Sequence, residues 1–283
     1  GLCHNALPLL RTLLFYPEQR PIVAQLFGIT PSAFRLAAVL VCQLGFDGID
    51  INMGCPAKNV ARRGAGAGLI ETPRLAKQIY QSVQAGVADW QRGATCLDYA
   101  EFSSEFCQKA IQQAKTYANL SSSDQTEVKR KSLPISIKTR LGIDRPDLDN
   151  WLKWVLSLEP AALTVHGRTL TQGYAGQADW ETVGQLASWA HDQLSKTLII
   201  GNGDLQSAEQ AQKQALKYQC DGALIGRAMQ GNPWIFTETG KAPQPEDQFR
   251  VALEHARFFE QTFQSWPKYS FLPMRKHLAW YIK

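Results

Sequence analysis

The sequence predicts an α/β fold of the (β/α)-barrel type, and three observations support this prediction. Short apolar, β-rich segments alternate with amphipathic stretches, which is typical of a parallel sheet covered by helices. Several of these segments end in glycine-containing loops, which favours a barrel over a doubly wound sheet. The chain has 283 residues, enough for one barrel-sized domain and a small appendage.

Six strands are expected, in the order 22–27, 48–53, 135–138, 162–166, 198–201 and 222–225. Helical patterns lie between them, for example at 32–44, 74–87, 148–157 and 207–218. Pro31, Pro73 and Ser207 stand near the beginnings of three of these helices, as helix-start signals do. A complete barrel has eight strands, so we expect its first strands to be missing from this chain.

Two regions depart from this strand–helix rhythm. About 85 residues separate the strand at Asp50 from the strand at Ile135, too many for one crossover. We interpret the excess, about 89–131, as a surface insertion with a helix near 99–118 and a flexible loop after it; an arm that contacts RNA or another subunit is the alternative. From about Pro243 onward, helix-forming sequence at 248–263 and 271–283 predicts a helical C-terminal segment.

The composition indicates a water-soluble protein with a sizeable core, since 45% of the residues are hydrophobic and 19% are charged. No apolar run approaches the ~20 residues that span a membrane, and no signal peptide is recognisable. Six cysteines are scattered without a C-x-x-C pair, which argues against a zinc site and suits a reducing cytoplasm. The net charge of +5 is compatible with an RNA partner without establishing one.

The segment around Cys55 carries the strongest chemical signal. An alternating apolar run that includes Ile51 and Met53 stops at Gly54-Cys55-Pro56, so a buried strand delivers one thiol to a loop at its C-terminal end. Pro56 ends the strand and restricts Cys55 to extended geometry. Glycines at 64, 66 and 68 allow tight turns or a close approach to a flat ligand. From the spacing alone, a buried structural cysteine is an equal alternative.

Polar residues at the other strand ends are the remaining candidates, because barrel active sites lie at the C-terminal ends of the strands. Lys138 would be a cation in an apolar barrel mouth and needs an anionic partner, either a ligand or a neighbouring carboxylate. His166 is either a ligand contact or a hydrogen-bonded core histidine. Two glycine loops after the last strands suit a phosphate. The strand-end candidates are Gln25, Asn52, Lys138, His166, Asn202, Gly203, Asp204, Gly226 and Arg227.

Several sequence motifs, which follow one another in the same order, resemble those of the tRNA-dihydrouridine synthase family. Their residues are most similar to the bacterial B branch of that family. The motifs are N-x-G-C-P-A-K-x-V at 52–60, VAQLFG at 23–28, SIKTR at 136–140, TVHGRT at 164–169 with QGYAGQADW at 172–180, IIGNGD at 199–204, LIGRAMQGNPWIF at 224–236 and RKHLAWY at 275–281. The family's first strand, with its flavin-contacting segment, has no counterpart here. The resemblance therefore implies a chain that is incomplete at both its N- and C-termini.

The resemblance implies a flavoenzyme with FMN as cofactor and NADPH as electron donor, reducing specific uridines of tRNA to 5,6-dihydrouridine. Hydride would pass from reduced FMN to C6, and Cys55 would donate a proton to C5. Residues 1–240 would form the FMN-binding barrel and 243–283 part of a helical tRNA-binding domain. A monomer without metal or membrane association is expected, and the residues assigned to tRNA are Lys58, Arg62, Arg63, Arg168, Arg275, Lys276 and His277.

Two other functions stay open at this stage. Another barrel flavoenzyme that reduces a free pyrimidine would also place a cysteine on a strand-end loop opposite a flavin. A truncated RNA-binding paralogue without cofactor is the alternative from a different class. A solvent-exposed basic helix face would equally explain the cationic residues at 275–277.

Overall fold

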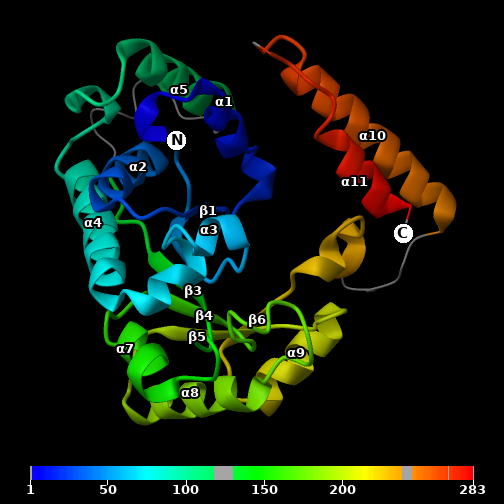
Figure 1. Ribbon diagram of the computed structural model, residues 1–283. Coiled ribbons are helices and arrows are strands. Elements are labelled where there is room, and N and C mark those ends of the chain that lie inside the picture. Colours follow the sequence, from blue (N-terminus) through cyan, green and yellow to red (C-terminus); the bar gives the residue numbers. More distant parts are fainter. Residues whose placement is uncertain (1, 118–129, 238–243, 267, 283) are drawn as a thin grey trace.

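The computed structural model describes residues 2–117, 130–237, 244–266 and 268–282, and its centre is one six-stranded parallel sheet (Figure 1). Sequence neighbours are also sheet neighbours, in the order β1 to β6. A doubly wound sheet reverses its strand order at a switch point, so this order confirms the barrel-type winding. The strands are β1 (Val23–Leu26), β2 (Gly48–Met53), β3 (Ile135–Arg140), β4 (Ala162–His166), β5 (Leu198–Asn202) and β6 (Gly222–Leu224).

Helices connect successive strands and cover the outer face of the sheet (Figure 1). A π-helical turn at Leu148–Leu152 leads into α7, where one continuous helix was predicted. Helix α8 lies outside the helical ranges named from the sequence; Asp179 caps it by accepting a hydrogen bond from the Thr182 N–H. The helices are α1 (Leu7–Leu10), α2 (Pro31–Gln43), α3 (Lys58–Ala61), α4 (Pro73–Gln91), α5 (Ser104–Tyr117), α7 (Lys153–Leu156), α8 (Trp180–Asp192), α9 (Ala208–Lys217), α10 (Pro245–Phe263) and α11 (Met274–Tyr281).

The hydrophobic core lies between the sheet and its covering helices. Ile49, Ile51 and Met53 of β2 are fully buried, and because successive side chains of a strand alternate, all three lie on the same face of the sheet. Helices α2 and α4 pack closely because α4 carries Gly86 at their crossing, where a Cβ would lie 2.3 Å from the Arg35 carbonyl oxygen. This packing fixes the β1–β2 side of the sheet.

The first half of the expected insertion belongs to the core. Helix α5 begins at Ser104 rather than near Tyr99, because the Ser103 hydroxyl accepts a hydrogen bond from the Phe106 N–H and caps the helix there. Phe106 and Cys107 are fully buried, so this part is not a loosely attached surface element. The expected flexible loop, including Ser121–Asp124, lies outside the described residues.

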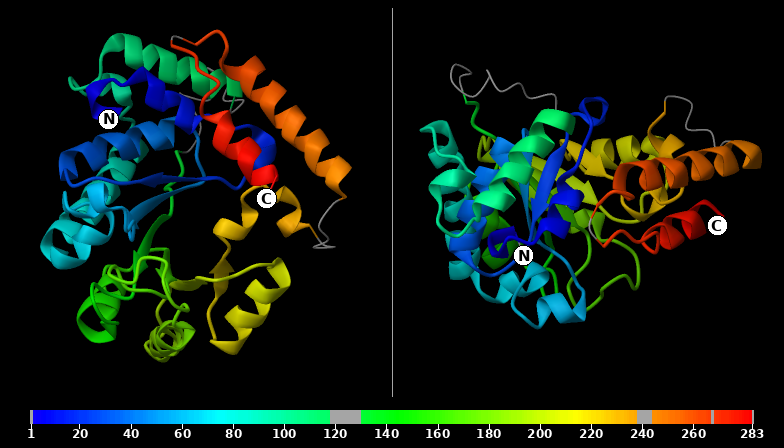
Figure 2. Two further views of the ribbon diagram at one scale, coloured as in Figure 1. Left: turned by 45° about the vertical axis from the view of Figure 1, so that its right-hand side comes forward. Right: turned by 90° about the horizontal axis from the view of Figure 1, so that it is seen from above.

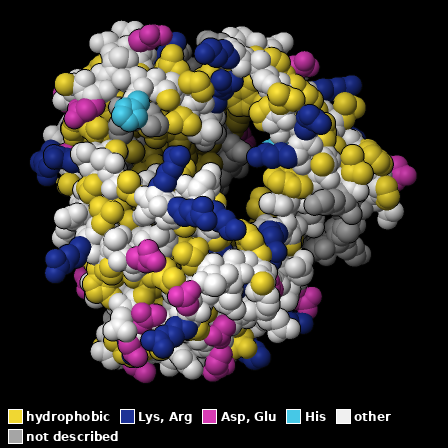
Figure 3. Space-filling model, viewed as in Figure 1, with side chains coloured by type: hydrophobic (Ala, Val, Ile, Leu, Met, Phe, Trp, Pro, Cys, Tyr) yellow, Lys and Arg dark blue, Asp and Glu magenta, His cyan; other side chains and the backbone are white. Residues whose placement is uncertain are grey.

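The C-terminal segment is helical, as predicted, and α10 packs against α11 (Figure 2). Helix α10 contacts the N-terminal segment, where the Tyr16 and Phe258 ring centroids are 5.5 Å apart. The space-filling view shows an opening between these helices and the main body, bordered by hydrophobic and cationic side chains (Figure 3). Within the described part of the chain, no helix is both long and apolar enough to traverse a bilayer.

Candidate active site

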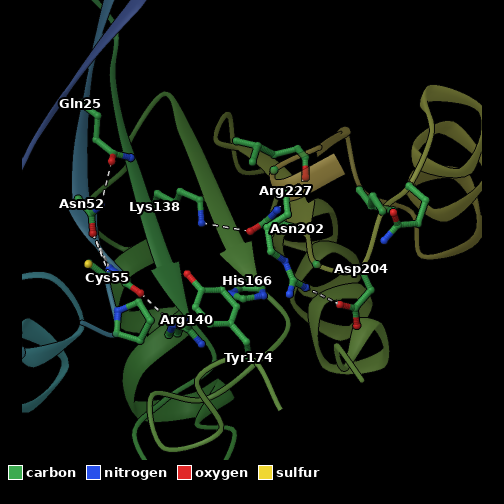
Figure 4. Close-up of a pocket in the computed structure, with 17 residues that line it drawn as sticks. Gln25, Asn52, Cys55, Lys138, Arg140, His166, Tyr174, Asn202, Asp204 and Arg227 are labelled. Atoms are coloured by element: carbon green, nitrogen blue, oxygen red, sulfur yellow. Dashed lines mark hydrogen bonds and ion pairs between the residues drawn. The ribbon is translucent and has the colours of Figure 1, made fainter. Parts of the chain in front are cut away.

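A cavity of about 300 Å³ lies at the C-terminal ends of the strands (Figure 4). Its size falls in the range of small-molecule sites. All ten residues predicted to be catalytic or cofactor-binding line it: Gln25, Asn52, Cys55, Lys138, His166, Asn202, Gly203, Asp204, Gly226 and Arg227. Residues that the sequence analysis did not assign complete the lining: Gly54, Pro56, Arg140, Tyr174, Leu205, Gln206 and Leu224.

Strand register brings these residues together although they are far apart in sequence. Asn52 of β2 is paired with Lys138 of β3, and Arg140 of β3 is paired with His166 of β4. His166 is in turn paired with Asn202 of β5. Neighbouring parallel strands are about 4.8 Å apart, so side chains in register on the same face are contact neighbours.

The Cys55 loop is held by hydrogen bonds from the strand that precedes it. Asn52 Oδ1 accepts from the N–H groups of Gly54 (3.1 Å) and Cys55 (2.9 Å). Asn52 Nδ2 donates to Gln25 Oε1 at 2.8 Å, which fixes the orientation of the amide (Figure 4). Gly66 has φ +59°, and a Cβ there would lie 2.9 Å from the Cys55 Cβ, so the loop packs directly on the cysteine. The thiol is therefore mounted rigidly at the cavity wall.

Lys138 contributes a cationic group with few protein partners. Its Nζ donates to Asn202 Oδ1 at 3.1 Å, and Asn202 Nδ2 donates to the Leu224 carbonyl at 2.7 Å. Burial lowers the pKa of Lys138, and Asp50 opposes this effect. Among the described residues no carboxylate forms an ion pair with Lys138, so the predicted alternative of a direct salt bridge is not what the structure contains. An anionic ligand would complete this environment.

Arg140 was missed by the sequence analysis, and it ties two loops to the sheet. Its guanidinium is buried and donates to the carbonyl oxygens of Gly54 (2.8 Å), Thr169 (2.9 Å) and Gly173 (2.8 Å). Next to it, the exposed Tyr174 ring lies 5.7 Å from the Arg140 guanidinium carbon, at the mouth of the cavity. A cation at this position also makes the cavity more attractive to anions.

Arg168, which contacts His166, forms an ion pair with the partly exposed Asp204. Arg168 Nη2 lies 2.7 Å from Asp204 Oδ2, and the Arg168 side chain is only 2% exposed. Burial would raise the pKa of Asp204, but hydrogen bonds from Arg168 and the Ala178 N–H lower it below its ordinary value. Burial, followed by the nearby cations Arg140, Lys138 and Arg168, lowers the pKa of His166 to about 3. The imidazole is therefore neutral at physiological pH.

The loop after β6 offers backbone N–H groups that have no acceptor among the described residues. No described oxygen accepts a hydrogen bond from the N–H groups of Gly226 or Arg227. The Arg227 side chain is 58% exposed and pairs with Asp204 at 3.2 Å (Figure 4). Gly203 has φ +134°, and a Cβ there would lie 2.5 Å from the Ala178 Cβ, so only glycine fits. These groups can receive an anionic group such as a phosphate.

The residues assigned to tRNA lie outside the cavity lining. Lys58, Arg62 and Arg63 are exposed on α3 and the turn that follows the Cys55 loop. Arg275 and Lys276 are exposed on α11, where the His277 ring packs against His255 with centroids 5.3 Å apart. Arg168 is also absent from the lining because its guanidinium lies behind His166.

No cluster of three or more potential metal ligands from His, Cys, Asp and Glu occurs in the described parts of the chain. The fold and the cavity together define the class: an α/β barrel-type protein with a strand-end pocket that presents a cysteine, a lysine and a neutral histidine. Such a pocket suits an anionic organic ligand held beside a proton donor.

Comparison with known proteins names the family. A family model described as dihydrouridine synthase (Dus) matches residues 8–114 and 109–283. The chain belongs to this family.

The curated relatives carry similar names. A "Probable tRNA-dihydrouridine synthase 2" of Bacillus subtilis is 31% identical over 232 residues, which cover 81% of this chain and 57% of that protein. A "Probable tRNA-dihydrouridine synthase" of Staphylococcus epidermidis is 29% identical over 250 residues, covering 88% and 63% respectively. The chain thus spans about three fifths of the length of these relatives.

Proposed function

We propose that this chain carries the catalytic domain, residues 1–240, and part of a tRNA-binding helical domain, residues 243–283, of an enzyme that reduces specific tRNA uridines to dihydrouridine. The observation that carries the proposal is the convergence of Cys55, Lys138, His166 and two glycine loops on one cavity of a Dus-family chain. FMN is the proposed cofactor, and NADPH the proposed source of its electrons.

The charges and hydrogen-bonding groups of the cavity support FMN as the ligand. Lys138 is a partly buried cation that forms no ion pair with a carboxylate among the described residues. The free N–H groups of Gly226 and Arg227, with the Arg227 guanidinium, would hold the phosphate. Gln25 offers an amide to the edge of a ring system. When bound, FMN would supply the hydride for reduction of the pyrimidine.

Cys55 is the proposed acid. Its thiol stands at the cavity wall on a loop fixed by Asn52, and an S–H group can donate one proton to a carbon that has accepted hydride. Arg140 holds the carbonyl of the preceding Gly54, so the loop cannot withdraw from the cavity without breaking that hydrogen bond. The exposed cations of α3 and α11 are the proposed contacts with tRNA phosphates.

The test begins with the visible absorption spectrum of the purified chain, before and after NADPH is added. A flavin band that bleaches supports the cofactor proposal, and formation of dihydrouridine in an unmodified tRNA transcript then tests the substrate. A colourless protein that binds tRNA in a salt-sensitive manner would instead favour the RNA-binding alternative. Reoxidation by free uracil as fast as by tRNA would favour the free-pyrimidine reductase.

Cys55→Ala tests the assigned acid. We expect it to retain flavin and its reduction by NADPH but to lose about 10²–10⁴-fold in dihydrouridine formation, the usual contribution of a positioned proton donor. Cys220→Ala is the matched control, because Cys220 is partly buried and does not line the cavity. Unchanged turnover in Cys55→Ala would refute the role assigned to Cys55.

A further inference from the structure

The environment of His166 determines which of its nitrogens carries the proton. His166 Nε2 lies 3.2 Å from Arg168 Nη1. A guanidinium has five N–H donors and no acceptor, so Nε2 must accept this hydrogen bond. A neutral imidazole has one N–H only, and its proton therefore sits on Nδ1.

The guanidinium that imposes this tautomer is itself immobilised. Arg168 Nη2 donates to both carboxylate oxygens of Asp204, at 2.8 Å and 2.7 Å. The same guanidinium donates to the carbonyl oxygens of Ala175 (3.1 Å) and Gly176 (2.5 Å). The buried Arg168 side chain would have to break several of these hydrogen bonds to leave its position.

We propose that Arg168, anchored by Asp204, is a positioning residue that holds His166 as the neutral Nδ1–H tautomer, so that the imidazole donates a hydrogen bond into the cavity. His166 lines the cavity, and among the described residues none accepts from Nδ1. The ligand would therefore place an acceptor atom, such as a carbonyl oxygen or an unprotonated ring nitrogen, against His166.

The charged groups around His166 keep it in this form. Lys138 and Arg140 face it from β3, and Arg168 faces it from its own segment. Asp204, from the segment after β5, is a nearby carboxylate, and its oxygens accept hydrogen bonds from Arg168. Tyr174 is a further titratable neighbour, with its ring centroid 6.3 Å from that of His166. A second proton on the imidazole would meet three cations, so the ring donates from Nδ1 only.

The identity of the acceptor rests on the proposed function, whereas the tautomer does not. For an FMN- and uridine-binding site the acceptor would belong to the flavin or the pyrimidine. A histidine held in this way neither gives nor takes a proton during turnover. It acts as a fixed donor, which leaves Cys55 as the proton source.

The tautomer can be measured directly by long-range ¹⁵N–¹H NMR of the full chain labelled at its five histidines, with His166→Gln used to assign the signals. We expect His166 to show the neutral Nδ1–H pattern from pH 5 to 8. In Arg168→Met the Nε2–H form should appear, and Arg168→Lys should restore the Nδ1–H pattern because an ammonium also donates. Arg227→Met is the matched control, since Arg227 pairs with Asp204 but makes no hydrogen bond to His166.

An Nε2–H or imidazolium pattern for His166 in the unmodified chain would overturn the inference. This outcome is read from the unmodified chain, so it does not depend on whether any variant folds. An unchanged Nδ1–H pattern in folded Arg168→Met would remove Arg168 as the cause. Added FMN should shift the Nδ1 proton resonance; binding without a shift would refute the donor role. A Nδ1–H pattern in a chain that never binds flavin would support the tautomer and count against the proposed function instead.

Discussion

Replacing His166 with glutamine should make the folded chain less sensitive to acid. The imidazole has a folded-state pKa of about 3 and an ordinary pKa of 6.5, so between these values the unfolded chain binds more protons than the folded one. The free energy of unfolding therefore falls as the pH drops through this window. The contribution of the neutral His166 to that free energy is fully present above pH 6.5. From pH 6.5 to pH 5, at ~1.36 kcal/mol per pH unit, the loss from this residue is about 2 kcal/mol.

The assay is urea unfolding of the unmodified chain and of His166→Gln at pH 8 and pH 5. The unmodified chain should lose about 2 kcal/mol more than the variant between the two pH values, because His255, His277 and the carboxylates titrate in both proteins and cancel. His191→Gln is the control: His191 is exposed beside Asp221, at 3.3 Å, and its removal should not reduce the acid loss. Equal losses in the unmodified chain and His166→Gln would refute the claim that His166 is buried neutral.

Two further predictions concern the packing that supports the site. Gly86→Ala should lower the free energy of unfolding by about 1–3 kcal/mol, because the alanine Cβ would lie 2.3 Å from the Arg35 carbonyl oxygen. Urea unfolding measures this loss, and Gln84→Ala, at an exposed position of the same helix, is the neutral control. Asp89→Asn should lower the free energy of unfolding by about 2 kcal/mol in the same assay, because it weakens the hydrogen bonds that the carboxylate accepts from Arg35 and Tyr99. Tyr99→Phe removes only one of these hydrogen bonds and should lower it by about 1 kcal/mol. An equal loss in both variants would contradict this ranking.

The strand-end residues could be predicted because two simple rules act together. Period-2 alternation marks which residues of a buried strand share a face, and parallel barrels place their sites at the C-terminal strand ends. Lys138 and Asn202 were assigned to the site on this basis, and the structure brings them to 3.1 Å. Arg140 was available to the same reasoning, since it lies two residues after Lys138 on the same strand. It was missed because the strand was expected to end at 138.

The loop contributions could not be predicted in this way. Tyr174 lies in a segment without periodicity, and its position depends on hydrogen bonds from Arg140 to the Gly173 carbonyl and from Arg168 to the Ala175 carbonyl. These bonds join residues that no local pattern connects. Arg168 was assigned to tRNA, and its pairing with Asp204, 36 positions away, had no local signal either.

The ladder pairing of Asn52 with Lys138, Arg140 with His166, and His166 with Asn202 restricts how this chain can vary in length. Adding or deleting one residue inside any of these strands would turn its polar side chain away from the cavity and toward the helices. Only segments between the strands are free of this constraint. Length changes compatible with the site should therefore accumulate in regions such as that between α4 and β3, where the chain already carries its longest connection, and not in the strands themselves.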